Sequence, residues 1–141
     1  MGLDCRSALS VSGCAKCMDG DEVDTECLGR IWKEYSQENI IIDSHFSQLL
    51  PVEYVIILAR SPEKIMEVLR ERGYPDQKIS ANLDSLLTGV IQYDASERLP
   101  TTRIFTVNGN ELSPYMTAVN VARIVRDIIA RESMKNIKKE F

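Results

Sequence analysis

Two runs of β-branched residues constrain the fold of this 141-residue chain more than any other feature. The first is Ile40-Ile41-Ile42, which closes on Asp43, and the second occupies residues 54–59 with the sequence Tyr-Val-Ile-Ile-Leu-Ala. Such side chains favour strands, and a strand without polar alternation is typical of a parallel sheet buried on both faces. A third strand is expected at residues 103–107, ended by Asn108-Gly109-Asn110.

Amphipathic helices are expected between these strands. Ser61-Pro62 and Ser113-Pro114 both carry a residue that caps a helix, followed by one that suits its first turn. The alternation of strands and helices indicates an α/β fold with a parallel sheet in a single domain, residues 1–141. The expected helices lie at about residues 23–35, 61–73 and 76–95 and from residue 113 onward, and residues 134–141 are expected to be a charged, frayed tail.

Composition excludes several classes of protein. The apolar fraction of 44% suffices for a core, and a net charge of −4 argues against a general nucleic-acid binder. No apolar run approaches the roughly 20 residues of a membrane span. No export signal is visible, so we expect a cytoplasmic protein with reduced thiols.

Asp43 and His45 are the first candidates for chemistry. In an open parallel sheet, ligands bind beyond the carboxyl ends of the strands, where Asp43 is expected. An apolar strand that closes on aspartate is how P-loop enzymes hold magnesium beside nucleotide phosphates. The alternative is that Asp43 caps the next turn, and matches of this short kind are common. His45, the single histidine, suits positioning a water or phosphate, or a structural role.

Arginines form the second group of candidates. Arg70-Glu71-Arg72 ends a helix just before Gly73, and Arg60 follows the second strand, facing the same crevice in this topology. Guanidinium groups bind phosphate oxygens in a bidentate way. Two arginines before a glycine suit a lid over a nucleotide, although basic residues also complement the dipole at the end of a helix.

The four cysteines allow a further reading, a small zinc protein. Cys14 and Cys17 have C-x2-C spacing, and Cys5 and Cys27 could complete the ligand set, but structural zinc sites normally use two close pairs. Cys27 also falls on the apolar face of its helix, as a buried cysteine would.

Residues 10–17 form at most a degenerate phosphate-binding loop. Lys16 stands where such a loop has its lysine, but Ser10, Ala15 and Cys17 are not the residue types that the pattern requires. No apolar strand precedes the segment either.

The run Asn-Ile-Ile-Ile-Asp-Ser-His-Phe-Ser-Gln-Leu-Leu-Pro at residues 39–51, followed by Arg-Glu-Arg-Gly-Tyr at residues 70–74, resembles the adenylate kinase isoenzyme 6-like family. These archaeal and eukaryotic kinases are also linked to small ribosomal subunit maturation. The resemblance covers residues 23–130 and is greater to archaeal members. It implies a three-layer P-loop nucleoside monophosphate kinase fold that transfers phosphate from ATP to AMP with Mg²⁺, and a small-subunit ribosomal protein as a further partner.

The same resemblance implies roles for individual residues. Asp43 would be the magnesium-binding acid and His45 its companion in nucleotide hydrolysis. Arg72 would contact ATP from a lid at residues 71–81, with Arg60 in the same crevice. Asn108-Gly109 would pass close to adenine. The monophosphate-binding region would lie at about residues 3–22.

The chain departs from the family pattern in one large respect. Members open with a strand, a glycine-rich loop and a helix, and none of the three is recognisable here. The first strand should lie centrally, so the strands ending at Asp43 and at Ala59 must pair directly or leave a gap of about 10 Å. A late start codon or a fragment would explain this, with about 25–35 residues upstream. The alternative is a catalytically impaired ribosome assembly or binding module.

Overall fold

The computed structural model describes residues 4–7, 17–19, 22–35, 40–44, 46–87 and 89–139. Its strands form three separate pairs. Parallel pairs join β1 (Asp4–Ser7) to β4 (Ile40–Asp43) and β5 (Val55–Ala59) to β6 (Ile104–Asn108), and β2 (Met18–Asp19) and β3 (Glu22–Val23) form an antiparallel hairpin.

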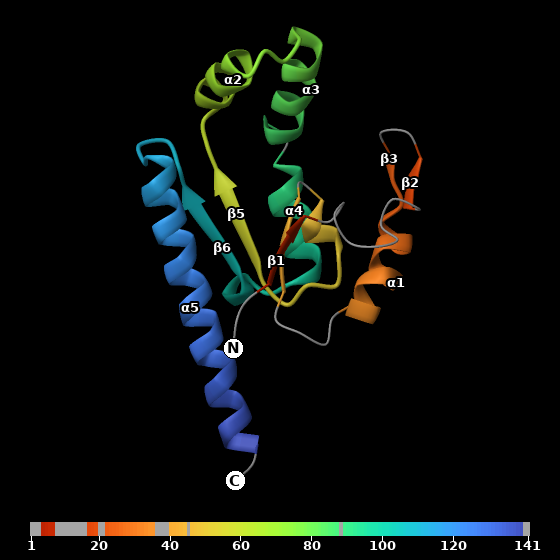
Figure 1. Ribbon diagram of the computed structural model, residues 1–141, viewed down its shortest axis with the longest axis vertical. Coiled ribbons are helices and arrows are strands. Elements are labelled where there is room, and N and C mark those ends of the chain that lie inside the picture. The colour runs from red at the N-terminus through yellow and green to blue at the C-terminus, as the bar shows by residue number, and fades with distance from the viewer. Residues whose placement is uncertain are drawn as a thin grey trace.

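Helices alternate with these strands, as the sequence pattern predicts. They are α1 (Thr25–Tyr35), α2 (Pro62–Glu71), α3 (Asp76–Leu87), α4 (Val90–Arg98) and α5 (Pro114–Lys139), with short 3-10 helices at Ser47–Leu49 and Thr101–Arg103. In Figure 1, α2 and α3 lie together beyond the carboxyl end of β5, and α5 runs alongside β6 and continues past the other end of the strand.

Strand β5 separates two helical layers. Val55 and Ile57 are buried in a cluster with Ala95 of α4. Successive side chains of a strand point to opposite faces, so Ile56 and Leu58 point to the other face, on which α5 lies. Helices on both faces of a parallel sheet give the expected three-layer α/β architecture.

The sheet is split in the middle. Among the described residues, β4 pairs with β1 and β5 pairs with β6, but no pairing joins β4 to β5. The sequence left two outcomes open for these strands, direct pairing or a gap. Direct pairing does not occur between the described residues of β4 and β5.

One expected helix is in fact two. The sequence predicted a continuous helix over residues 76–95, but α3 ends at Leu87 and α4 begins at Val90. Between them Gly89 has a φ of 61°, a left-handed conformation that residues with a Cβ rarely adopt. The helical spacing of the apolar residues continues across the break, so periodicity alone did not reveal it.

The start of the first predicted helix and the end of the last one also differ in the structure. Helix α1 begins at Thr25, because Val23 belongs to β3, and the Asp24 carboxylate accepts a hydrogen bond from the Cys27 amide at 2.9 Å. The predicted frayed tail is wrong up to Lys139, since α5 continues to that residue. Glu132 on this helix accepts hydrogen bonds from Tyr54 and from Lys135, and the first of these ties the helix to the start of β5.

The expectation of reduced thiols is contradicted at two cysteines. Cys17 and Cys27 form a disulfide, with their Cα atoms 5.5 Å apart. Cys17 is buried in a cluster with Leu28, Phe46 and Leu50, and Cys27 packs against this cluster but is only partly buried. Within the described part of the chain, no group of three potential metal ligands occurs, and Cys14 lies outside it.

No helix among the described residues is long and apolar enough to cross a membrane.

Candidate functional site

Asp43 is the last residue of β4, and its side chain is exposed. The chain turns sharply after it. The Ser44 hydroxyl oxygen accepts a hydrogen bond from the Phe46 amide at 3.3 Å, and the Ser47 hydroxyl donates to the Ser44 carbonyl at 3.0 Å. Phe46 is buried and anchors this turn. The turn therefore fixes the backbone beside Asp43, while the carboxylate stays open to solvent at the carboxyl end of the strand.

Arg60 and Gly109 are neighbours because of the register of β5 and β6. Ala59 lies opposite Asn108, so the next residues of the two strands leave the sheet side by side. The Gly109 amide donates to the Ala59 carbonyl at 2.8 Å, and the Ser61 amide donates to the side-chain oxygen of Asn110. These bonds hold the two strand ends as one unit.

Asn108 has a structural partner in the same turn. Its side-chain oxygen accepts a hydrogen bond from the Asn110 amide at 3.0 Å, and the residue is exposed. This bond is a local turn interaction of the kind that asparagine favours. It uses the side-chain oxygen as an acceptor and does not engage the side-chain nitrogen, which is the donor of the amide group.

Arg72 caps the carboxyl end of α2. Its amide donates to the Val68 carbonyl at 3.1 Å, and the Gly73 amide donates to the Arg70 carbonyl at 2.9 Å. Gly73 has a φ of 75°, the left-handed conformation that commonly ends a helix. The chain reverses there, and α3 then packs beside α2 above the strand ends (Figure 1).

Arg60, Arg72 and Gly109 line one small cavity, which we call the arginine pocket. It has a volume of about 310 Å³ and lies at the carboxyl ends of β5 and β6. Among the described residues neither arginine forms an ion pair, so two positive charges border one cavity. Such a cavity suits phosphate oxygens. The remaining lining residues are Leu58, Ala59, Ile65 and Thr117.

The predicted site residues are only partly brought together. Three of the six surround the arginine pocket, and Asn108 adjoins it through the turn to Gly109. Asp43 does not line this pocket, because it ends β4, which is not paired with β5. His45 and residues 10–16, most of the degenerate phosphate-binding loop, lie outside the described part of the chain.

The segment predicted as a lid, residues 71–81, spans the end of α2, the following turn and the start of α3. Apart from the buried Ile79, every residue in it is exposed. The Lys78 ammonium lies 4.6 Å from the centre of the Tyr74 ring, a cation–π contact within the segment. The exposure of this segment is compatible with a lid.

Sequence reasoning missed Thr117. It lines the arginine pocket from the first turn of α5, and its hydroxyl donates to the Ser113 carbonyl at 3.0 Å. One signal could have found it: a hydroxyl residue three positions after Pro114, which opens the helix that follows β6, must lie close to the carboxyl end of that strand. Ile65 of α2 forms another part of the wall.

We compared the chain with protein-family models and with known proteins. A family model described as an AAA domain matches residues 1–89. A protein of Thermoplasma volcanium named "Putative adenylate kinase" is 36% identical over 110 residues, which cover 77% of this chain and 71% of that protein. The chain belongs to the adenylate kinase-like family. A protein of the same name from Thermoplasma acidophilum is 30% identical over 125 residues, covering 89% and 82% of the two chains.

Membership of the adenylate kinase-like family confirms the resemblance drawn from residues 39–51 and 70–74, and with it the P-loop α/β fold class. The coverage differs between relatives. The match to a protein of the same name from Pyrococcus abyssi is 39% identical over 85 residues, but spans only 59% of this chain and 47% of that protein.

Proposed function

We propose that this chain acts as a nucleoside monophosphate kinase that transfers the γ-phosphate of ATP to AMP and yields two molecules of ADP. The observation that carries the proposal is the pair of guanidinium groups, Arg60 and Arg72, around one pocket at the carboxyl ends of parallel strands. Ligands of open α/β sheets bind at that edge. The names of the relatives from both Thermoplasma species agree with this activity.

Phosphoryl transfer requires little covalent chemistry from the protein, which mainly positions the substrates and neutralises charge. A phosphate oxygen of AMP attacks the γ-phosphorus of ATP, the bond to the β–γ bridging oxygen breaks, and ADP leaves. Arg72 would neutralise charge that develops on the transferred group, and Arg60 would hold phosphate oxygens on the strand side of the pocket. Asn108 and Gly109 would lie near the adenine. His45 would position water when ATP is hydrolysed instead.

The residues present fit a magnesium ion. Mg²⁺ keeps several waters and is commonly held by one or two carboxylates together with substrate phosphates, so a dedicated cage of ligands is not needed. Asp43 offers one exposed carboxylate at the correct edge of the sheet. Bound there, the ion would neutralise charge on the β- and γ-phosphates of ATP.

A test of this proposal uses Asp43→Asn, which keeps the shape of the side chain and removes its charge. We expect the melting temperature to stay unchanged and formation of ADP from ATP and AMP, followed by ³¹P NMR across a magnesium titration, to fall at least tenfold. Asp127→Asn, an exposed carboxylate on α5, is the matched control and should retain full turnover. Equal turnover of the two variants contradicts the role of Asp43.

A second function rests on two observations: no phosphate-binding loop is recognisable in the sequence, and β4 and β5 are not paired among the described residues. The chain would then be a binding module for a small-subunit ribosomal protein, independent of nucleotide. Calorimetry with ATP, ADP and AMP separates the two functions. Absence of binding and of turnover at saturating magnesium favours the module, and micromolar binding of ATP favours the kinase.

A further inference from the structure

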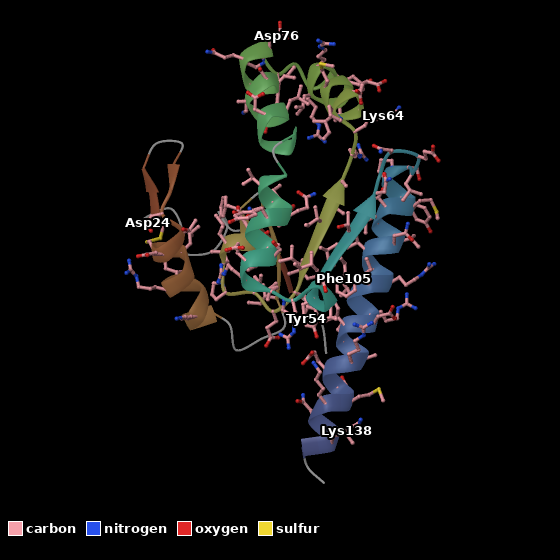
Figure 2. All side chains as sticks on the ribbon, turned by 180° about the vertical axis from the view of Figure 1, so that it is seen from behind. Asp24, Tyr54, Lys64, Asp76, Phe105 and Lys138 are labelled. Carbon is pink, nitrogen blue, oxygen red and sulfur yellow. A yellow bond between two sulfur atoms is a disulfide. The ribbon has the colours of Figure 1, made fainter. Side chains whose placement is uncertain are left out.

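The disulfide between Cys17 and Cys27 takes no part in the proposed phosphoryl transfer, yet it lies in the packing that supports one of the site residues. Cys17 directly precedes β2, and Cys27 belongs to the first turn of α1. In Figure 2 the bridge lies close to the labelled Asp24, where the hairpin of β2 and β3 meets the helix. The bridge therefore joins the hairpin to α1 by a bond that a change in redox state can break.

The hairpin is small, so the bridge is a large part of what holds it. Strands β2 and β3 have two residues each, and a ladder this short is marginal by itself. The Asp24 amide donates to the Cys17 carbonyl at 2.8 Å and closes the hairpin at its base. Cys17 is 2% exposed and lies in the buried cluster with Leu28. The position of the hairpin thus depends strongly on the bridge and on the packing around it.

The packing around the bridge reaches the turn that follows Asp43. Cys17 shares its buried cluster with Phe46, the residue that anchors this turn. Cys27 packs against the same cluster, and so does Ile42, the neighbour of Asp43 in β4. One contiguous cluster therefore connects the two sulfur atoms with the backbone beside the Asp43 carboxylate.

Reduction of the bridge must disturb this cluster. It replaces one covalent bond by two thiol groups, which need more space than the bridge. The cluster has little room for them, because Leu28 is 0% and Leu50 is 1% exposed, and protein interiors are packed as densely as organic crystals. Either the hairpin or the turn at Phe46 has to move. The bond that holds the hairpin thus also controls how firmly the turn is held.

The two cysteines differ in exposure, which decides how a reductant reaches the bridge. Cys17 is buried, whereas Cys27 is only partly buried, so a reducing thiolate would attack Sγ of Cys27. The bond between the two sulfur atoms breaks, and Cys17 leaves as a thiolate that takes up a proton. A second thiol of the reductant then displaces Cys27 and closes the reductant's own disulfide. A dithiol therefore supplies the two electrons, and an oxidised dithiol reverses both steps.

We propose that the bridge between Cys17 and Cys27 is a redox switch of the proposed kinase, operated by a protein dithiol. The oxidised form holds Asp43 in place for magnesium, and the reduced form releases the turn at Phe46 and weakens the magnesium site. In the cytoplasm expected from the sequence, a disulfide is usually transient and regulatory. The inference rests on the proposed function, because the regulated site is that of the kinase, but release of the turn can be measured without nucleotide.

Release of the turn is tested by amide hydrogen exchange, well below the melting temperature, before and after reduction with dithiothreitol. The amides of Leu49 and Leu50 donate to the carbonyls of Phe46 and Ser47, so their exchange reports on the turn. We expect it to accelerate at least tenfold on reduction, with exchange in β6 unchanged. Equal exchange in both redox states overturns the switch. Acceleration throughout the chain overturns it as well, because the bridge would then be a general brace.

Variants test whether the cluster carries the effect. Cys27→Ser should exchange as the reduced form does, with or without dithiothreitol. Phe46→Leu loosens the contact between the bridge and the turn, and the acceleration on reduction should fall at least threefold. Ile57→Val is the matched control, since it trims a buried side chain of the cluster beside α4 and should keep the full response. An unchanged response in Phe46→Leu overturns the coupling through this cluster.

The effect on the site is measured as ADP formation across a magnesium titration. The reduced chain should need at least a fivefold higher magnesium concentration for half-maximal turnover. Cys14→Ser leaves the bridge intact and should respond as the wild type does. An equal magnesium requirement in both redox states overturns regulation of the site. Absence of turnover in both states contradicts the proposed function, and with it the regulation of that site, whereas an unreleased turn overturns the switch even in an active kinase.

Discussion

Gly109 packs so closely against Arg60 that a Cβ atom at position 109 would lie 3.1 Å from Nε and 3.3 Å from Cγ of the arginine. The backbone of Gly109 is outside the left-handed region, so an alanine there would meet no conformational strain. The absence of a side chain at this position instead sets where the Arg60 guanidinium lies. The end of β6 thereby positions a cation that follows β5.

Gly109→Ala should displace Arg60 without unfolding the protein. We expect ATP affinity, measured by calorimetry, to fall about tenfold, because the guanidinium moves within the arginine pocket. Gly29→Ala is the control, since a Cβ there would meet only Pro51 Cδ at an ordinary 3.8 Å. That change lies within α1 and should raise stability by about 0.5–1 kcal/mol. A Gly109→Ala protein with unchanged affinity contradicts the coupling to Arg60.

Arg72→Ala and Arg70→Ala separate phosphate chemistry from the stability of a helix end. Both residues lie at the end of α2, but only Arg72 lines the arginine pocket. Loss of Arg72 should reduce phosphotransfer by about 10³-fold, the order found for arginines that neutralise transferred phosphate. Each variant should lose at most about 1 kcal/mol of stability from the helix dipole. The measurements are initial rates and thermal melts, and equal rates in the two variants refute the assignment.

The contact between Tyr54 and Glu132 should make stability depend on pH. The phenol donates a hydrogen bond to the carboxylate, and Lys135 lies 2.9 Å from the same oxygen. In Figure 2 Tyr54 lies near Phe105 at the same end of β5 and β6, beside α5, with ring centres 6.5 Å apart. The hydrogen bond from Tyr54, followed by that from Lys135, lowers the pKa of Glu132. The hydrogen bond to Glu132, followed by burial, raises the pKa of Tyr54.

The two pKa shifts act on stability at opposite ends of the pH range. A lowered carboxyl pKa stabilises the fold above the ordinary value of 4.5 and loses this effect as pH falls through the folded value. A raised phenol pKa stabilises it below 10.0 and loses this effect as pH rises further. Urea unfolding of Glu132→Gln should therefore show its full deficit against wild type near pH 7 and a smaller deficit near pH 3. A deficit independent of pH would falsify the ionic contribution.

The disulfide between Cys17 and Cys27 should contribute measurably to stability. It closes a loop over a sequence separation of 10 and joins Cys17, which directly precedes β2, to Cys27 of α1. A bridge of this size contributes about 2–3 kcal/mol by restricting the unfolded chain. A phosphine reductant should lower the melting temperature of the wild type and leave Cys17→Ser unaffected. Alkylation of Cys17 without prior reduction, followed by mass spectrometry, would show instead that the bridge is absent.

The positions of strands β4, β5 and β6 could be predicted from the sequence. Runs of β-branched apolar residues such as Ile40-Ile41-Ile42 favour buried strands wherever they occur. The N-terminal cap of α2 could also be predicted, because it depends only on residues that are close in the sequence. Ser61 accepts a hydrogen bond from the Lys64 amide at 3.4 Å, and Pro62 opens the helix. The end of the same helix at Gly73 follows from the tolerance of glycine for positive φ. These features depend on neighbours in the chain, and a linear sequence contains that information.

Only the tertiary structure decided which distant residues meet. The register of β5 on β6 placed Gly109 against Arg60, and the arrangement of α2 above the sheet brought Arg72 to the same pocket. The pairing of Cys17 with Cys27 likewise depends on a contact that residue spacing does not encode. The sequence alone determined the residue types available at the carboxyl ends of the strands. Packing of helices on a split sheet determined which of them share a cavity, because long-range contacts arise from burial in three dimensions.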